Sequence, residues 1–501
     1  MLTTDFGKLT PFMCMEVLPG DSFKVNSEVF ARVAPMVAPI MSRVDIKTYF
    51  FFVPNRILWN GWEDFITGGE DGRTIRPMPM IEQQAMDSLG SFTTGSLGDY
   101  MGLFMANRMN HDHNSGVCAL PFMAYQKIYN DWFRDQNLQD EIAWNKDADG
   151  NQLTADELTA LMSMRYACWE KDYLTSALPW PQRGPEVVLP LKEGDIRIND
   201  FTLHASNEVY SQGDMKWLRN GQQGRDITLR TDDGNTIISA SGEGRLESVA
   251  PTIRELRKSI SVQQWLENNA RGGARYIEQL LTHFGVKSSD ARLQRAELLG
   301  GGTSPVLISE VLQTSPSDVD GISTVGNMAG HGVSANRTHS FKRYFEEHGF
   351  VIGICFVRPK NSYMSGVHRM WLRQDKFDFA WPEFARIGEQ EIKNVEVQTN
   401  HPNGDGVFGY APRYSEYKYH GSEIHGDFLT TMDSWHTARK FSSDPGKEPK
   451  LNANFVSMRN SSQSLERIFA FDADGVDHFW LQIYNNIKVK RCLPYYGTPS
   501  I

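Results

Sequence analysis

The sequence has few cysteines, no long apolar run and no secretory signal. Its five cysteines, an odd number in 501 residues, include no Cys-x-x-Cys pair. We therefore expect reduced, mostly buried thiols in a protein made in a cytoplasm. No stretch reaches the roughly eighteen apolar residues of a membrane helix. The start, MLTTDFGKLTPF, has no charged segment followed by an apolar core, so we expect neither membrane insertion nor secretion.

Excess positive charge is also absent. Lysine and arginine number 51 against 61 aspartates and glutamates, which gives a net charge of −10, and neither terminus carries a basic cluster. This balance argues against a chain that condenses nucleic acid by itself. The hydrophobic fraction of 40% is that of a globular protein. Length alone allows two to four ordinary domains or one elaborated domain.

Catalytic and metal-binding signatures are missing as well. The sequence has no Gly-x-Ser-x-Gly elbow, phosphate-binding loop or dinucleotide fingerprint. His111-Asp112-His113 and the pair His420 and His425 lack the His-Glu-x-x-His arrangement of zinc enzymes. Glu389 and Glu391 would share one face of a strand, but we interpret them as two solvated glutamates rather than an acid-base pair. We expect no enzyme, metal or cofactor.

Strand signals dominate the segments that we expect to form the core. From Phe23 to Val33 the odd positions are mostly apolar and the even positions mostly polar, which predicts a half-buried strand. Thr48 to Val53 and Phe350 to Val357 are continuous apolar runs bounded by Pro54 and by Gly349 and Arg358-Pro359. Runs this short and this rich in aromatic and branched residues predict strands buried on both faces.

Three segments have helical spacing, and we expect their apolar stripes to be packing faces. The first follows Pro121 and the second begins at Ile253. The third lies in the block Arg271 to Gly302, where Gly285 is placed to end the helix as a left-handed cap. The stripes are Phe122, Tyr125, Tyr129, Trp132 and Phe133; Ile253, Leu256 and Ile260; and Tyr276, Ile277, Leu280, Leu281 and Phe284.

The same block ends in three consecutive glycines, Gly300 to Gly302. No Lys-Ser or Lys-Thr follows them, so they do not form a phosphate-binding loop. Because glycine has no side chain, a neighbouring segment can approach its backbone closely. We therefore predict a close backbone contact at this position.

Six blocks resemble one family over nearly the whole chain. In order they match the major capsid protein of the Microviridae, small icosahedral phages with circular single-stranded DNA, and particularly its gokushovirus branch. The blocks are EVLPGDSF near the start, LPFMAYQKIYNDWFRDQNLQD (Leu120 to Asp140), DYLTSALPWPQRGPEVVLPL (Asp172 to Leu191), the block Arg271 to Gly302, FEEHGFVIGICFVRP (Phe345 to Pro359) and VFGYAPRYSEYKY (Val407 to Tyr419).

The resemblance implies one capsid domain over residues 1–501: a mainly β, eight-stranded viral jelly roll with long loop and helical insertions. It implies self-association into a T=1 icosahedral shell around circular single-stranded DNA, assembled in the host cytoplasm and located in the virion. A separate small, strongly basic protein helps to package the genome in this family. A scaffolding protein, spike or vertex components and a host receptor are the further partners that it suggests.

The resemblance also locates an insertion. Residues 193–249 are polar and look variable relative to the family pattern, and the gokushovirus shell has a protrusion at each threefold axis built from this part of the chain. We predict a surface protrusion that contributes to host attachment; the alternative is a mobile loop. Asp226 to Arg230 and Thr236 to Ser239 flank the sequence TDDGN, which predicts a hairpin.

Two sets of residues are candidates for function in a shell. Tryptophan and arginine dominate interface hot spots, so we predict contact anchors at Trp132, Arg134, Trp180 and Arg183, with core burial as the alternative for the tryptophans. From Phe479 onward, alternation predicts a strand with an apolar face and a face of rings and cations. That second face, with the arginine after it, predicts single-strand binding toward the particle interior by Trp480, Tyr484, Lys488, Lys490 and Arg491.

Two alternatives to the second set stay open. Asn485-Asn486 as a turn would break the shared face, and an ordinary edge strand would carry lysines as protection against aggregation. For the whole chain the competing class is a β-sandwich carbohydrate-binding protein or glycoside hydrolase, favoured only by abundant aromatic residues and scattered carboxylates.

Overall fold

The computed structural model describes most of the chain. It describes residues 1–82, 93–103, 116–187, 252–314, 328–442, 444, 446–459, 462–470 and 476–493. Between these ranges it also describes the short strands 202–205, 208–210, 215–218, 228–231, 239–241, 318–319 and 322–323. The chain divides into two compact units, Gln182–Asn268 and the remainder. In the described residues no helix is long and apolar enough to cross a membrane.

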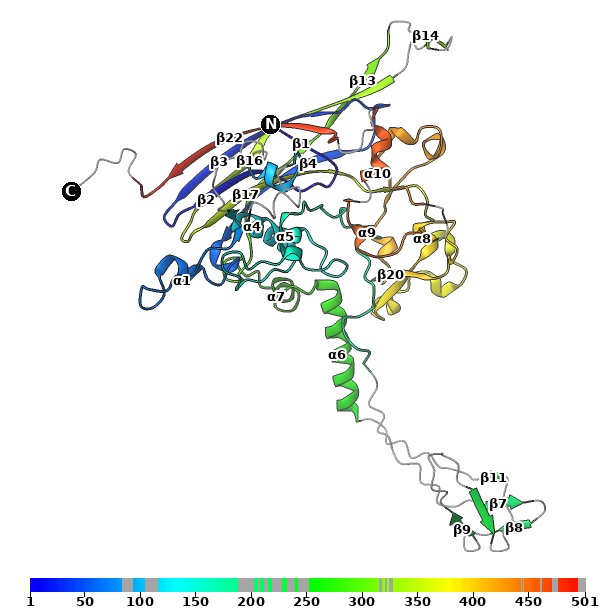
Figure 1. Ribbon diagram of the computed structural model, residues 1–501. Helices are drawn as coiled ribbons and strands as arrows, with labels where there is room; N and C mark the ends of the chain where they lie inside the picture. The colour runs from blue at the N-terminus through cyan, green and yellow to red at the C-terminus, as the bar shows by residue number, and fades with distance from the viewer. Residues whose placement is uncertain are drawn as a thin grey trace. The chain divides into compact units, whose positions relative to one another are not determined.

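The larger unit is built on two antiparallel sheets that face each other (Figure 1). The five-stranded sheet has the order β1 (Leu2–Thr4), β22 (Phe479–Lys490), β3 (Ser22–Val33), β16 (Met328–Tyr344), β13 (Leu307–Leu312). The four-stranded sheet has the order β12 (Glu297–Pro305), β4 (Val44–Pro54), β17 (Gly349–Pro359), β2 (Thr10–Val17). The chain crosses between the sheets from β2 to β3, β3 to β4, β12 to β13 and β16 to β17. The predicted jelly-roll sandwich is confirmed, with the short β1 as an additional strand.

The sandwich core forms from the alternation that the sequence predicts. In β3 every second residue from Phe23 to Val33 is buried. Phe23 and Val25 meet Phe50 from β4 and Phe341 from β16, and the last two rings lie 5.1 Å apart. Burying a large side chain of this kind stabilises the fold by about 1.5–3 kcal/mol.

The four-stranded sheet is buried on both faces, as the continuous apolar runs predict. Phe50 and Phe52 of β4 point into the sandwich, whereas Phe51 belongs to a second core on the opposite face. Helix α4 (Leu120–Ile128) covers that face with the buried side chains of Phe122 and Tyr125, and a π-helical turn, η3 (Tyr129–Phe133), continues it. The first predicted packing helix is therefore confirmed.

The three glycines lie in β12 and allow the close contact that was predicted. A Cβ atom on Gly302 would lie 2.5 Å from the ring of His339 in β16. That ring is fully buried, and it bonds the hydroxyl of Thr48 and, at 2.8 Å, the hydroxyl of Ser304. Burial lowers the pKa of His339, so the ring is held neutral between two hydroxyl groups.

The other two helices form where predicted, but they do not pack as predicted. Helix α7 (Tyr276–Phe284) ends at Gly285, whose φ of 67° is the left-handed cap. Tyr276 and Phe284 are nevertheless 68% and 76% exposed, and the helix has no buried residue. Helix α6 (Ile253–Gly272) leaves Ile253 and Ile260 exposed. The helical spacing identified an apolar stripe, but it did not show whether other residues of the same chain bury that stripe.

The remaining elements of the larger unit are short. Its helices are α1 (Trp62–Thr67), α3 (Leu97–Tyr100), α5 (Ala155–Met162), α8 (Asn394–Val397), α9 (Ala453–Val456) and α10 (Ser462–Leu465). Its paired strands are β5 (Met80–Ile81) with β6 (Val117–Cys118), β14 (Asp318–Val319) with β15 (Ile322–Ser323), β18 (Ser362–Tyr363) with β21 (Ser422–Glu423), and β19 (Glu389–Lys393) with β20 (Val407–Pro412). Its 3-10 turns are η1 (Asn55–Ile57), η5 (Arg369–Leu372), η6 (Lys376–Asp378), η7 (Pro382–Phe384), η8 (Ser415–Tyr417), η9 (Gly426–Leu429), η10 (Asp433–Trp435) and η12 (Glu466–Ile468).

The described part of the smaller unit contains five short strands. Strand β10 pairs with β9, and β11 pairs with β7, which also pairs with β8. Most of the second strand of the predicted hairpin, Thr236 to Ser239, lies outside the described residues, so the hairpin stays a prediction. The strands are β7 (Thr202–Ala205), β8 (Glu208–Tyr210), β9 (Met215–Leu218), β10 (Thr228–Thr231) and β11 (Ser239–Ser241). The rest of 193–249 lies outside the described residues.

Candidate nucleic-acid interface

Strand β22 presents the ring-and-cation face that the sequence predicts. It runs unbroken from Phe479 to Lys490, so Asn485-Asn486 is not a turn. Phe479 and Leu481 are buried in the sandwich, whereas Trp480 and Tyr484 are 46% and 60% exposed. Asn485, the one polar residue on the inner face, accepts a hydrogen bond of 2.6 Å from Ser27.

The register adds cations that the sequence alone did not bring together. Lys488 of β22 lies opposite Lys24 of β3, which lies opposite Lys342 of β16. The three lysines form one row across three neighbouring strands on the outer face of the five-stranded sheet, the side away from the core. Lys490 lies one position further along the same face of β22. We call Lys24, Lys342 and Lys488 the lysine row.

The lysine row is electrostatically unfavourable in the isolated subunit. Like charges directly opposite on neighbouring strands destabilise a sheet, by about 1 kcal/mol for a pair 4 Å apart in water. Among the described residues, no acidic side chain forms an ion pair with any of the three lysines. An ion pair further along this sheet joins Arg337 to Glu28 at 2.6 Å. An arrangement of this kind fits an anionic partner.

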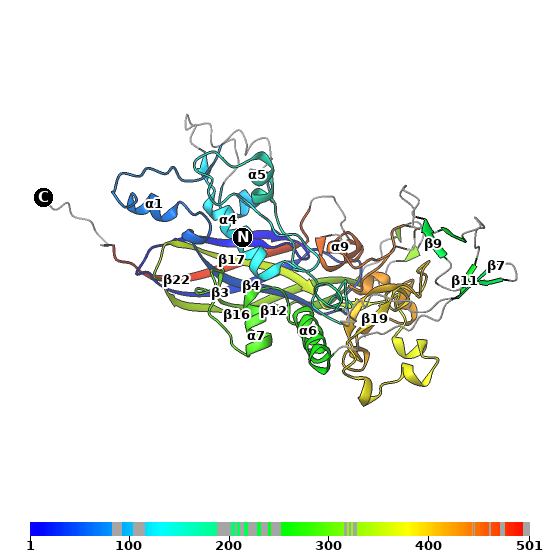
Figure 2. The same ribbon diagram turned by 90° about the horizontal axis from the view of Figure 1, so that it is seen from below.

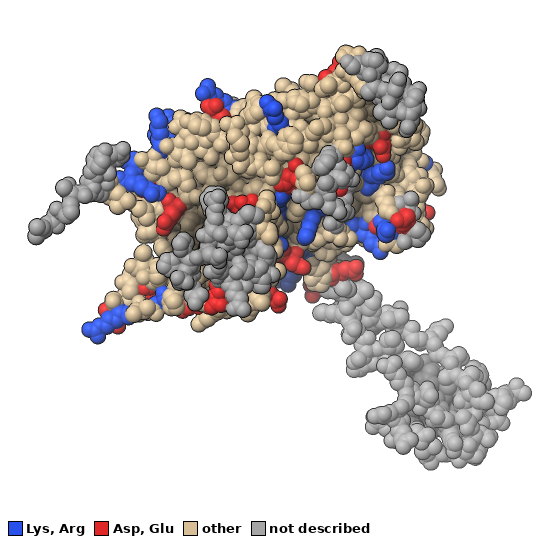
Figure 3. All heavy atoms as spheres, turned by 45° about the horizontal axis from the view of Figure 1, so that its top comes forward, with Lys and Arg blue, Asp and Glu red and all other residues tan. Residues whose placement is uncertain are grey.

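Edge protection explains only part of the lysine row. Lysines on an exposed edge strand prevent pairing with another chain, and this applies to Lys488 and Lys490, because β1 covers only residues 479–481 of β22. Lys24, however, lies on β3, which is hydrogen bonded to β22 on one side and β16 on the other. Figure 3 turns this sheet toward the viewer and shows lysine and arginine side chains at its left end.

Arg491 differs from the lysines. Its Nε donates to the fully buried carboxylate of Asp21 at 3.0 Å, and a second nitrogen donates to the carbonyl of Glu16 at 2.7 Å. The guanidinium also lies 5.9 Å from the ring centre of Phe23. These contacts give Arg491 a role within the subunit, which its position after the strand did not reveal.

The predicted contact anchors occupy different surroundings. Trp132 donates from Nε1 to the carbonyl of Ala296 at 2.8 Å, and Arg134 donates to the carbonyl of Gln139 at 2.8 Å. Both line a cavity of about 550 Å³, and contacts within the chain account for both side chains. Trp180 and Arg183 are half-buried and lie in different units. The interface role of all four residues stays a prediction.

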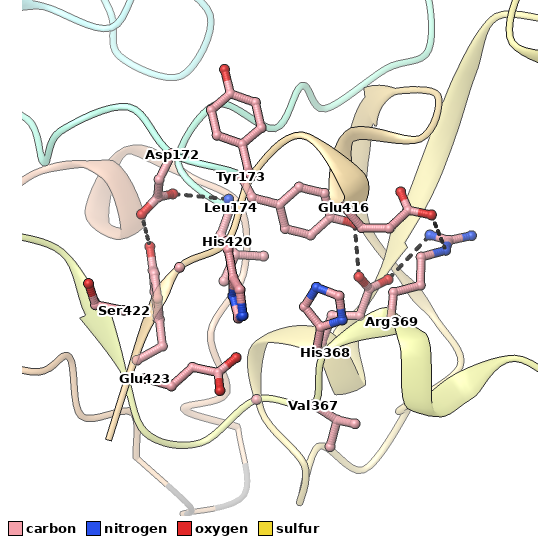
Figure 4. A pocket seen from close by; sticks show the side chains of 15 residues that line it. Asp172, Tyr173, Leu174, Val367, His368, Arg369, Glu416, His420, Ser422 and Glu423 are labelled. Carbon is pink, nitrogen blue, oxygen red and sulfur yellow. Dashed lines mark hydrogen bonds and ion pairs between the residues drawn. The ribbon is translucent and has the colours of Figure 1, made fainter. Parts of the chain in front are cut away.

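A second pocket gathers carboxylates and histidines, and internal contacts hold its charged groups (Figure 4). The hydroxyl of Tyr173 bonds Glu396 at 2.8 Å, and Arg369 lies 3.4 Å from the same carboxylate. The rings of His368 and His420 lie 5.7 Å apart. Among the described residues, no three histidine, cysteine or acidic side chains form a metal-binding group; His111-Asp112-His113 lies outside them.

The glutamate pair corrects another interpretation. Glu391 is exposed, but the side chain of Glu389 is fully buried and forms an ion pair with Arg271. Glu389 is therefore not a solvated surface residue, because an arginine distant in the sequence covers it.

All five cysteines are free; Cys355 is buried, three are half-buried and Cys492 is exposed. Burial raises the pKa of Cys14 to about 12, which keeps that thiol protonated and unreactive.

A two-sheet jelly roll is a fold that viral capsid proteins share with lectin domains and cupins. The profile of the family described as "Capsid protein (F protein)" matches residues 1–501. The chain therefore belongs to this capsid protein family and is a structural component of phage virions.

Three relatives support this assignment over nearly the full length. Capsid protein VP1 of Bdellovibrio phage phiMH2K is 37% identical, with 99% of this chain and 93% of the relative covered. Capsid protein VP1 of Chlamydia phage 1 is 32% identical, with 100% and 94% covered. Capsid protein VP1 of Spiroplasma virus 4 is 29% identical, with 99% and 92% covered.

Proposed function

We propose that the subunits form a T=1 shell around circular single-stranded DNA and contact it with the outer face of the five-stranded sheet. The lysine row carries this proposal. Three adjacent strands present like charges there, and neighbouring phosphates would relieve the repulsion between them. Trp480 and Tyr484 lie on the same face and are about half exposed. Ring stacking on unpaired bases contributes about 1–3 kcal/mol per base, and the cations follow the phosphates.

The number of cations on this face is small for a genome-binding surface. With a net charge of −10, the subunit needs another source of positive charge. We infer that a small basic protein supplies it, and that the sheet positions the strand locally rather than condensing it. Scaffolding, spike or vertex components stay expectations from the resemblance.

Changing Lys24, Lys342 and Lys488 to glutamine is expected to leave assembly intact and to lower the DNA content of purified particles at least severalfold. Because each single-strand phosphate contact contributes about −0.7 to the slope of log K against log salt concentration, this slope should become shallower by roughly 2. The measurements are DNA per particle and binding of an oligonucleotide at increasing salt.

A matched variant controls for net charge. Changing Lys287, Lys418 and Lys450, which are exposed elsewhere, to glutamine removes the same charge and should leave DNA content near the wild-type value. Equal loss of DNA in both variants would show that only net charge matters. An unchanged DNA content after loss of the lysine row would contradict the proposed contact.

We also propose that residues 193–249 form the surface protrusion and contribute to host attachment. The family position, the polarity of the tract and the separate unit Gln182–Asn268 support this proposal. Replacing 193–249 with a short Gly-Ser linker is expected to leave soluble, assembling subunits and to reduce attachment of particles to host cells at least tenfold. Insoluble subunits after this deletion would show instead that the tract belongs to the core.

A further inference from the structure

A segment with many exposed aromatic side chains lies between β18 and β19. Residues 369–387 fold into the turns η5, η6 and η7, which are drawn in yellow near β19 in Figure 2. We call this segment the aromatic arm. Six of its large apolar side chains are 45–74% exposed, namely Met370, Trp371, Phe377, Phe379, Trp381 and Ile387.

Buried ion pairs hold the base of the aromatic arm. Arg369 lies 3.4 Å from the carboxylate of Glu396, and Arg373 lies 3.5 Å from that of Glu416. The side chains of both glutamates are almost inaccessible, with 3% and 2% exposed. The guanidinium of Arg373 also lies 4.5 Å from the ring centre of Tyr417. A cation placed between a buried carboxylate and a ring fixes the backbone that carries the exposed rings.

Hydrogen bonds fix the outer part of the arm. The backbone N–H of Trp381 donates to the hydroxyl of Tyr414 at 3.1 Å, and its indole N–H donates to the carbonyl of Lys376 at 2.8 Å. The carboxylate of Asp378 accepts from two backbone N–H groups, those of Gln374 and Asp375. The arm is therefore preorganised, so that binding a partner costs little conformational entropy.

We propose that the aromatic arm binds a second copy of this chain and forms the centre of one contact between subunits. The inference rests on self-association within the proposed shell, in which every subunit contacts several copies. Tryptophan-rich clusters at the centre of a contact contribute most of its binding energy. Exposed rings on a rigid segment have this character, whereas the predicted anchor Trp132 is occupied within the subunit.

The size of the apolar surface fits such a contact. A buried aromatic side chain covers about 150–250 Å². Four rings that are about half exposed, those of Trp371, Phe377, Phe379 and Trp381, therefore offer roughly 400 Å². A stable contact buries about 800 Å² on each partner, so the arm would supply about half of one side. A patch of several hundred Å² on an isolated subunit marks an interaction surface.

The charges of the arm favour a protein partner over nucleic acid. The two arginines at its base are paired with buried glutamates. Beyond them, residues 374–387 contain three acidic and two basic side chains, namely Asp375, Asp378, Glu383, Lys376 and Arg386. Phosphates would gain no net attraction from this set.

The test separates contact formation from folding. The double variant Trp371→Ser, Ile387→Ser is expected to keep the melting temperature of the isolated subunit within about 2 °C, because both side chains are more than half exposed. The yield of particles should fall at least tenfold. The matched control, Ile75→Ser, removes an apolar side chain that is 92% exposed elsewhere and should assemble like the wild type.

A cross-linking experiment identifies the partner. A photoreactive phenylalanine analogue at position 371 in assembled particles should yield a covalent pair of capsid chains. Cross-links only to nucleic acid, lipid or another protein would overturn the proposal, as would normal assembly of the double variant or a lowered melting temperature of its isolated subunit. DNA content per assembled particle is measured separately, so failure of the DNA contact would be distinguishable from failure of the arm.

Discussion

Replacing Gly302 with valine is expected to lower the free energy of unfolding of the isolated subunit by about 3 kcal/mol or more, and to reduce the yield of soluble protein. The new Cβ would lie 2.5 Å from the His339 ring. That ring cannot move freely, because it is buried and bonded to the hydroxyls of Thr48 and Ser304. Overpacking in a core usually costs about 1–3 kcal/mol, and a branched side chain at a rigid contact lies at the upper end of this range. Denaturant unfolding measures the change.

Two further variants sharpen this result. In the double variant Gly302→Val, His339→Ala the ring is gone, so the double variant should lose less stability than the sum of the single variants. Gly404→Val is the control, because a Cβ atom there meets neighbours only at 3.7 Å and beyond. Additive losses in the double variant would contradict the proposed contact between Gly302 and His339.

Replacing Arg491 with glutamine is expected to destabilise the subunit by about 2 kcal/mol, whereas Lys488→Gln should change stability by less than about 0.5 kcal/mol. The reason is that Asp21 is fully buried and would lose the guanidinium that neutralises it. Breaking a fully buried pair costs about 3–5 kcal/mol, and the smaller figure allows for the 35% exposure of the Arg491 side chain.

Comparing Arg491 with Lys488 distinguishes a structural cation from a DNA-binding one. The melting temperature of the isolated subunit should fall for Arg491→Gln and stay unchanged for Lys488→Gln. Equal melting temperatures for the two variants would mean that the pair with Asp21 contributes nothing. In that case Arg491 would return to the set of candidate DNA contacts.

The sandwich was predictable because its signals are local. Alternation over Phe23 to Val33 and the apolar runs at Thr48 and Phe350 each fall within a dozen residues, and burial follows directly from them. The left-handed cap at Gly285 is equally local. The exposed face of β22 was predictable for the same reason, since period-two alternation assigns side chains to faces without knowledge of the neighbouring strands.

The lysine row, the pairing of Arg491 and the burial of Glu389 were not predictable, because each depends on which distant segment lies opposite. Lys24 and Lys488 belong to opposite ends of the chain, and only the register between β3 and β22 brings them together. The aromatic arm was missed for another reason. Its rings have no regular spacing, so no periodic pattern separates exposed rings from core residues.

A reconstruction of the assembled particle by electron microscopy would show directly whether the five-stranded sheet faces the genome. We predict a T=1 shell in which the outer face of the five-stranded sheet, with Lys24, Lys342, Lys488 and Trp480, lines the interior against density for single-stranded DNA. A shell in which this face points to the outside, with no nucleic acid near the lysine row, would contradict it.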